Sequence, residues 1–179
     1  MKHKILLILG CVLVLSSCAE TEARRPITQK TGTVLSETID ERKKLNASEI
    51  RFIEQYIAQD STKAYQTSSD GFWYHYETKV EEALKTPKIG DVVEFTYNIT
   101  SLYGDTIYSL EELGTKSYAV DKEELISGLQ EGIKLMKIGE TITFVIPSYR
   151  AFGLVGDGDK IGINQTIKST VTLVNIKEE

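Results

Sequence analysis

The sequence has little of the residue types on which most hydrolytic and metal chemistry depends. It contains two cysteines, Cys11 and Cys18, and His75 is the one histidine beyond the first 17 residues. A Ser/His/Asp or Cys/His triad would have to use His75, which stands in an aromatic stretch with no evident partner. The His and Cys spacing of zinc sites is absent. Asp157 and Asp159 resemble the opening of a calcium loop, but no acid stands at its closing position. Hydrolysis and metal chemistry are disfavoured, and we predict an apolar binding pocket without a metal or cofactor.

The N-terminus also lacks the roughly 20 consecutive apolar residues that a membrane-spanning helix needs. A shorter apolar run at residues 5–15 follows two lysines, which is typical of a secretory signal peptide. The two serines before Cys18 look like a lipobox, so we predict that residues 1–17 are removed and that Cys18 is lipidated. Cys11 is the weaker candidate, because cleavage there would leave apolar residues at the mature end. An ordinary signal peptide with incidental cysteines is the alternative.

Basic residues are outnumbered by acidic ones. The formal net charge is -5, and it becomes -7 when residues 1–17 are lost, because they carry two lysines and no acid. This balance argues against nucleic acid or an anionic membrane surface as the partner. The expected location is the cell envelope, as a lipoprotein held at the periplasmic side or the outer membrane by its N-terminal lipid. Since lipidation of Cys18 leaves no thiol for a disulfide, stability must come from an apolar core.

Residues 18–44 carry scattered charges and no sustained apolar period, which predicts a flexible tether. Asn46 with Glu49 three positions later makes a capping box. Apolar residues then recur at helical spacing at Ile50, Ile53 and Ile57. We predict a helix over about 46–60, within a helical extension at 45–70. Its apolar face either packs on its own domain, which we favour, or forms a dimer or partner contact.

The rest of the chain, residues 71–179, has the alternation of strands joined by turns. We predict strands over residues 72–78, 92–100, 106–110, 141–146 and 166–177, with a looser segment at 111–120. In the second of these strands one face carries Val93, Phe95, Tyr97 and Ile99. The fourth alternates as a half-buried strand does. The last has Ser169 as the one polar residue among its inward positions.

A helix is predicted before the fourth strand, over residues 121–136. Asp121 and Glu124 make a capping-box start. Its apolar stripe consists of Leu125, Leu129, Ile133 and Met136. Gly128 and Gly132 each cost about 1 kcal/mol relative to alanine inside a helix. Glycines four residues apart usually allow a close approach, so we expect this helix to lie against the sheet.

The stretch at residues 125–153 reads LISGLQEGIKLMKIGETITFVIPSYRAFG. Its order of I-x-G-L-x-E-G, M-x-x-G-E, I-P and A-F-G resembles the FKBP-type peptidyl-prolyl cis-trans isomerases, and the likeness covers about the last 110 residues. With the lipobox, the chain looks most like the gliding-motility-associated isomerase lipoproteins of Bacteroidetes-type bacteria. The resemblance implies an α+β fold, in which a twisted antiparallel sheet of about five strands wraps around one short helix.

The resemblance also implies an activity that suits an apolar pocket. Rotation about an Xaa–Pro bond is slow because amide resonance, which sets a barrier near 18–20 kcal/mol, is lost in the twisted state. An apolar site that fits the twisted imide lowers this barrier without a nucleophile or cofactor. The expected substrates are proline-containing polypeptides, among them exported envelope proteins and gliding components. The alternative is a weakly active or inactive FKBP-like lipoprotein that serves as a peptide-binding chaperone or scaffold.

Site residues follow from the resemblance position by position. The pocket residues that match the catalytic positions are Tyr97, Ile126, Leu129 and Phe152. Those that match substrate-binding positions are Ile107, Tyr108, Leu125, Ile161 and Ser169. The backbone N–H of Ile126 would hold a peptide carbonyl. Three residues depart from the family pattern: Tyr108 replaces an Asp, Phe152 a Tyr and Ser169 an inward Phe. These departures weaken the case for tight macrolide binding.

Overall fold

The computed structural model describes residues 31–82 and 84–178, so the predicted signal peptide and Cys18 lie outside the described part. The chain divides into Met1–Asp40 and Glu41–Glu179, and the packing below is that of the second unit. The helical elements are α2 (Thr31–Gln59), α3 (Leu110–Leu113), α4 (Ser127–Ile133) and the 3-10 helix η1 (Ser148–Arg150). The strands are β1 (Gln66–Thr67), β2 (Trp73–Thr78), β3 (Val92–Tyr97), β4 (Ile99–Ser101), β5 (Thr106–Tyr108), β6 (Thr115–Ala119), β7 (Thr141–Ile146) and β8 (Ile167–Lys177). None of the described helices is both long enough and apolar enough to cross a bilayer.

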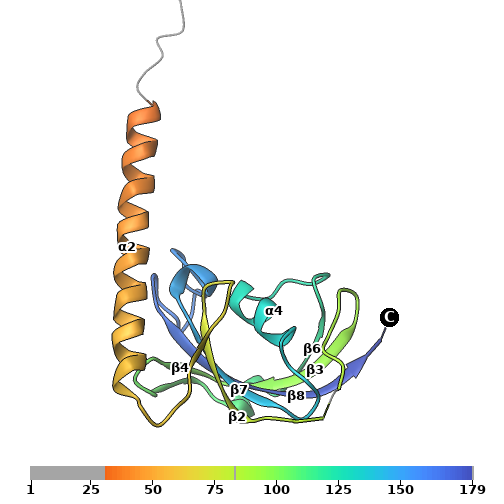
Figure 1. The fold of residues 1–179 in the computed structure, drawn as a ribbon. Helices are drawn as coiled ribbons and strands as arrows, with labels where there is room; N and C mark the ends of the chain where they lie inside the picture. The colour runs from red at the N-terminus through yellow and green to blue at the C-terminus, as the bar shows by residue number, and fades with distance from the viewer. Residues whose placement is uncertain (1–30, 83, 179) are drawn as a thin grey trace, which may run out of the picture. The chain divides into compact units, whose positions relative to one another are not determined.

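All strand pairs are antiparallel, in the order β1-β2-β7-β8-β3-β6, and β4 pairs with both β5 and β8. The sheet curves around α4, which lies inside the curve (Figure 1). This confirms the predicted α+β fold. The five predicted strands are present, and β1 and β6 are added to them.

The predicted strand at residues 92–100 is interrupted at Asn98, which separates β3 from β4. The Asn98 side-chain oxygen accepts from the Thr170 N–H at 2.9 Å, and the Asn98 N–H donates to the Thr170 carbonyl at 3.2 Å. The segment described as looser, residues 111–120, is ordered instead. It contains most of α3, whose N-cap is Ser109, and then β6, which pairs with β3.

The predicted helix start at Asp121 is wrong. Asp121 has φ 56 and lies in a turn, in which the N–H groups of Lys122 and Glu123 donate to the Ala119 carbonyl. The Glu123 carboxylate accepts from the Ala119 N–H at 3.1 Å. The chain is thus held in a turn where the capping box predicted a helix. Helix α4 begins after Ile126, which is extended at φ -58 and ψ 135, and it ends at Ile133.

Both glycines of α4 face β7, as expected for a helix pressed on the sheet. A Cβ at Gly128 would lie 2.5 Å from Cγ2 of Ile146, and one at Gly132 would lie 2.7 Å from Cε1 of Phe144. Only glycine fits at this separation. The core between α4 and the sheet is apolar apart from the buried Ser169; its fully buried apolar members include Phe72, Val93, Phe95, Leu129, Ile133, Met136, Ile142, Phe144, Ile146, Ile167, Val171 and Leu173.

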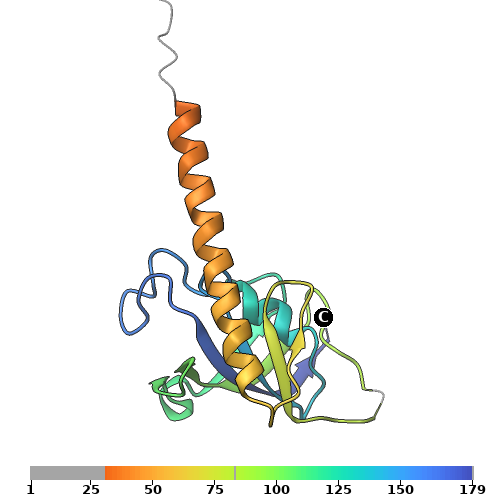
Figure 2. The ribbon, with the colours of Figure 1, turned by 60° about the vertical axis from the view of Figure 1, so that its left-hand side comes forward.

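The opposite side of the sheet has a smaller core beneath α2. Ile53 is fully buried there against Trp73, Leu102 and Val145. The last turns of α2 pass across β2 and β7 in Figure 2. This confirms that the apolar face of α2 packs on its own domain, whereas a helix-mediated dimer stays a prediction. It also corrects the half-buried assignment of β7, because α2 covers the second face and leaves Val145 with no exposed surface.

The helix itself is longer than predicted. It begins at Thr31 rather than near Asn46, so residues 31–44, assigned to the tether, are helical. The sequence from 33 to 59 contains neither glycine nor proline, the two residues that most disfavour a helix interior. The predicted capping residues Asn46 and Glu49 are therefore interior residues of α2. Glu49 is thus not needed as a cap and contacts a loop instead.

Candidate active site: an apolar cavity at the start of helix α4

A cavity of about 230 Å³ lies where the end of β3, the start of α4 and the loop after η1 meet. Its walls are Tyr97, Ile99, Lys116, Glu124, Leu125, Ile126, Leu129 and Phe152. All four residues predicted at catalytic positions are in this set, and so is Leu125. Leu129 and Ile99 are almost fully buried and belong to the main core. The cavity is thus floored by aliphatic side chains that the fold itself holds in place.

Tyr97 ends β3 and forms one wall of the cavity. Its ring lies 5.4 Å from that of Phe95, centroid to centroid, on the floor side. Burial raises the pKa of the Tyr97 hydroxyl, so the group stays protonated at neutral pH. Within residues 31–82 and 84–178 no side chain or backbone group is hydrogen-bonded to this hydroxyl. Tyr97 therefore presents a ring face and a spare O–H donor to a ligand.

The backbone N–H of Ile126 is a second donor at the cavity. Ile126 is the N-cap of α4, and the first N–H groups of a helix have no intrahelical acceptor. The Ile126 carbonyl accepts from Leu129 and Gln130, at 2.9 and 3.0 Å. No acceptor for the Ile126 N–H occurs in the described part of the chain. The N–H is therefore available to a ligand, and its carbonyl-holding role stays a prediction from the family resemblance.

Phe152 reaches the cavity from a loop that is tied on two sides. Ser127 Oγ, in the first turn of α4, donates to the Arg150 carbonyl at 3.1 Å. The N–H groups of Ala151 and Gly153 both donate to the Ser148 carbonyl, at 2.9 and 2.8 Å. The loop is thus closed on itself and fastened to α4, which fixes the aromatic wall.

The same loop is also held from α2. Glu49 accepts from the Ser148 N–H at 2.6 Å and from Ser148 Oγ at 2.8 Å, and it also accepts from Thr166 Oγ1 at 2.5 Å. Hydrogen bonds to a charged group are among the stronger ones in proteins. A residue about a hundred positions away in the sequence therefore braces the segment that carries Phe152. Sequence reasoning missed this role, because the spacing of Glu49 from Asn46 had the form of a helix cap.

Four residues predicted at substrate-binding positions do not line this cavity. Ile107 packs against the main core and Ile161 is buried in it. Ser169 is fully buried, and its hydroxyl donates to the Asn98 carbonyl at 2.8 Å. It thereby helps to fix the break between β3 and β4, directly after Tyr97.

Tyr108 fastens a different loop. Its hydroxyl donates to Asp157 Oδ2 at 2.5 Å, which raises the pKa of Tyr108 to about 12. Asp157 Oδ1 accepts from the N–H groups of Asp159 and Ile161. Burial acts to raise the pKa of Asp157, but these hydrogen bonds prevail and lower it. Lys160 Nζ lies 4.6 Å from the centroid of the Tyr108 ring. The two acids that resemble the opening of a calcium loop thus order their own loop.

Two charged residues at the cavity were not predicted, Lys116 and Glu124. Lys116 lies in β6 opposite Phe95, on the same side as the buried Tyr118. The alternation of Lys116, Tyr118 and Val120 could have predicted a strand with Lys116 on its inward side. The polar residues between them make that alternation hard to recognise in the sequence. Glu124 was interpreted as part of a helix cap. Both charges lie at a cavity whose floor is apolar, where they can favour or reject charged residues beside a bound proline.

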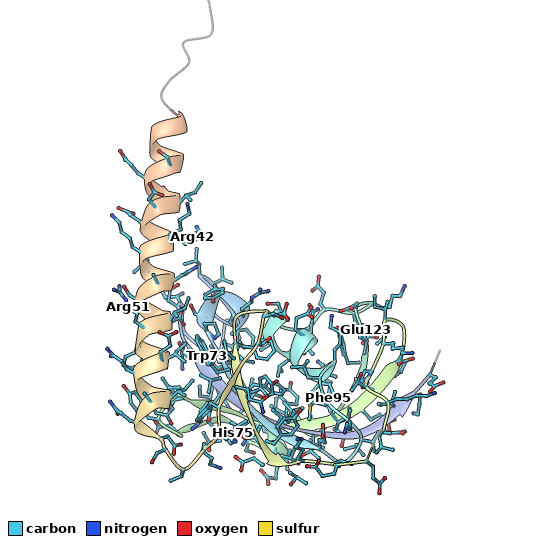
Figure 3. All side chains as sticks on the ribbon, in the orientation of Figure 1. Arg42, Arg51, Trp73, His75, Phe95 and Glu123 are labelled. Carbon is cyan, nitrogen blue, oxygen red and sulfur yellow. The ribbon has the colours of Figure 1, made fainter. Side chains whose placement is uncertain are left out.

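His75 is not among the residues that line the cavity. It is buried in β2 among residues of the α2 side, with its Nε2 3.6 Å from the Glu77 carboxylate and its ring edge-on to Tyr65. Figure 3 labels His75 on β2, apart from α4. In the part of the chain that the structure describes, no group of three or more His, Cys, Asp and Glu side chains could hold a metal ion.

The comparisons with known proteins agree with this geometry. The sequence signature of the family "FKBP-type peptidyl-prolyl cis-trans isomerase" matches residues 84–174. The chain is 34% identical over 125 residues to the "Probable FKBP-type peptidyl-prolyl cis-trans isomerase FkpA" of Neisseria meningitidis. That match covers 70% of this chain and 44% of the relative, so the chain spans less than half of that protein. It is 29% identical over 109 residues to "FK506-binding protein 2" of Dictyostelium discoideum, covering 60% of this chain and 82% of the relative.

A solved structure is similar over nearly the whole chain. The crystal structure of FkpA from Escherichia coli superposes with a TM-score of 0.61 at 25% identity, covering 98% of this chain and 82% of that one. The matched signature spans about half of the present chain and includes all nine predicted site residues other than Cys18. The chain therefore belongs to the FKBP-type peptidyl-prolyl cis-trans isomerase family.

Proposed function

We propose that this protein catalyses the cis–trans isomerisation of Xaa–Pro bonds in polypeptides. The observation that carries the proposal is the cavity at the start of α4, which has aliphatic and aromatic walls. It also has two donors without a partner among the described residues, the Tyr97 hydroxyl and the Ile126 N–H. A proline ring fits against Leu129 and Phe152, and the donors hold the peptide on either side of it. Water stabilises the planar amide, so transfer into this apolar site favours the twisted state.

Turnover on short Xaa–Pro peptides tests this proposal. Wild type should accelerate isomerisation clearly, and Leu129→Asp, which puts a charge on the cavity floor, should abolish the acceleration. Tyr97→Phe removes one hydrogen bond, worth about 0.5–1.5 kcal/mol, so kcat/KM should fall roughly two- to tenfold. Tyr103→Phe is the matched control, since Tyr103 is an exposed tyrosine away from the cavity. Absence of turnover in wild type would refute the proposal.

A binding module without turnover is the second candidate. Phe152 supplies no hydroxyl where the family pattern has a Tyr, and Lys116 and Glu124 make the cavity rim polar. Without the hydroxyl the site has one donor fewer for the twisted state of the peptide bond. The two charged residues can still contact a bound peptide. Phe152→Tyr separates the two functions: an isomerase should gain about two- to tenfold in kcat/KM from the added hydrogen bond. A binding module would still bind proline peptides while showing no turnover in either form.

We further propose that the protein acts in the cell envelope as a lipoprotein that assists the folding of exported proteins, gliding components among them. The support is the sequence before residue 19: two lysines, an apolar run and two serines preceding Cys18. Metabolic labelling with a radioactive fatty acid should mark the protein, and Cys18→Ala should lose the label and the membrane fraction. A deletion strain that exports and glides normally would contradict the client assignment.

A further inference from the structure

A second and larger cavity, of about 380 Å³, lies between α2 and the loop that carries Phe152. We refer to it as the α2 groove. Its walls include Arg42 and Leu45 from the helix, Tyr149 from η1, and Phe152, Leu154 and Val155 from the loop. Arg42 is labelled in Figure 3 on α2, beside this loop. The volume is in the range of about 300–1,000 Å³ that is usual for ligand sites. The cavity at the start of α4, which we call the proline cavity, is below that range.

The groove and the proline cavity adjoin the same residue. Phe152 contributes to the walls of both cavities. A polypeptide whose proline lies in the first cavity therefore meets the α2 groove as soon as its chain passes Phe152. Isomerase substrates are segments of longer chains, so the residues next to the proline must lie somewhere on the surface around this ring.

The groove has the chemistry of a surface for apolar residues. Three of its members are exposed aliphatic residues: Val155 is 83% exposed, Leu45 61% and Leu154 49%. Apolar side chains gathered and exposed in this way mark a binding site more often than chance exposure does. Among the described residues of the walls Arg42 is the one that is charged, so the groove also tolerates an acidic residue in its ligand.

Both walls are held in place before any ligand arrives. Glu49 of α2 accepts two hydrogen bonds from Ser148, at 2.6 and 2.8 Å. The Asn164 N–H donates to the Gly153 carbonyl at 2.8 Å, which fastens the far side of the loop. Because helix and loop are already joined, a ligand in the groove does not have to order them.

We propose that the α2 groove binds the apolar segment that flanks the proline in the same polypeptide substrate. The proposal rests on the proposed isomerase function and extends it, since it defines substrates by two features: a proline, and a neighbouring run of residues such as Leu, Val or Phe. Helix α2 would thereby select unfolded chains with exposed apolar segments, and the start of α4 would act on their prolines.

Three peptide types test the proposal with the purified full chain. The first is an Xaa–Pro tetrapeptide, which fills the proline cavity alone. The second carries four Leu and Val residues on one side of the proline, made in both directions, and the third replaces them with Gly and Ser. Wild type should show a KM about tenfold lower for one of the two apolar peptides than for the tetrapeptide, since burying even one or two aliphatic side chains supplies that factor.

Two variants should remove this advantage without changing turnover of the tetrapeptide, Leu45→Glu and Val155→Asp. Both residues are so exposed that the fold tolerates the change. The matched control is Ile89→Glu, which charges an equally exposed residue, 68% accessible, outside the two cavities. Equal KM values for all three peptides in wild type, or an equal loss in the Ile89 variant, would overturn the proposal.

Binding of the same peptides, labelled with a fluorophore and followed by anisotropy, separates this proposal from the isomerase function. If wild type lacks turnover but binds the apolar peptide through Leu45 and Val155, the isomerase function fails and the groove assignment holds. If turnover is normal and binding ignores both residues, the groove assignment fails alone. If the two variants instead convert a dimer to a monomer in sedimentation, the groove is a contact between copies and the substrate assignment is wrong.

Discussion

On β7, Ile142, Phe144 and Ile146 face α4, whereas Thr143 and Val145 face the side that α2 covers. The side of the sheet that faces α4 is apolar except at the buried Ser169. The opposite side has one apolar patch, around Ile53, and then a ladder of polar pairs, such as the Thr143 and Thr170 hydroxyls at 2.8 Å.

This difference in polarity indicates that the two sides of the sheet have different roles. The side facing α4 has no space to spare, since Gly128 and Gly132 touch β7 side chains, and it supplies the floor of the proline cavity. The side facing α2 is joined by fewer apolar contacts and by the hydrogen bonds of Glu49, and through them it positions the Phe152 loop. The α4 side should therefore govern stability, and the α2 side should govern how well the site is shaped.

The largest effect is expected from Phe144→Ala on the α4 side. Phe144 is fully buried between α4 and the sheet, and truncation leaves a cavity that its packed neighbours cannot fill. The free energy of unfolding should fall by about 3–5 kcal/mol. Urea denaturation followed by circular dichroism measures this. A loss smaller than that of Ile53→Ala would reverse the proposed ranking of the two sides.

Ile53→Ala tests the α2 side with the same kind of change. Ile53 of α2 is fully buried, but its core is small and lies over β2 and β7, towards one edge of the sheet. The expected loss is about 2 kcal/mol, the low end for such truncations. Hydrogen exchange should rise in α2 and in residues 148–153 and stay slow in β7 and β8. Uniform acceleration across the sheet would show that both sides unfold as one unit.

Glu49→Gln isolates the polar link between α2 and the loop. The amide keeps one acceptor oxygen but loses the charge, so stability should fall by about 1.5 kcal/mol. Turnover of proline peptides should fall as well, because Phe152 is then less well fixed. Glu54→Gln is the control, since Glu54 is an exposed residue of the same helix. Equal melting temperatures for the two variants would contradict a structural role for Glu49.

The smallest effect is a pH dependence located at His75. Burial lowers the pKa of His75, although the charge of Glu77 acts to raise it. The folded state therefore holds the proton less tightly than the unfolded state, so stability is full above the unfolded pKa of about 6.5 and declines as the pH falls through the folded pKa. Urea midpoints at several pH values below neutrality should decline in wild type and stay flatter in His75→Leu. Parallel curves would assign the dependence to other groups.

Much of the fold follows from local pattern in the sequence. The dense aromatic residues at 72–78 predicted β2, and the alternation at 141–146 predicted β7. The paired glycines predicted that α4 presses on the sheet. The cavity walls Tyr97, Ile126, Leu129 and Phe152 were found through the family resemblance, because their chemistry is that of ordinary core residues. Lys116 and Glu124 were missed, since a charged residue looks the same in a sequence whether it meets water or a cavity.

The features that the sequence predicts depend on interactions over a few residues, whereas those that only the tertiary structure decides depend on distant segments. Periodicity, glycine spacing and turn residues act over a few positions. They were therefore enough to predict the strands, the packing of α4 on the sheet and the apolar residues under the cavity. The start of α4 after Ile126, the burial of both faces of β7 and the use of Glu49 as a brace depend on which distant segment arrives as a partner. Glu49 and Ser148 stand about a hundred residues apart, and only the packed sheet with α2 across it brings a carboxylate to that loop.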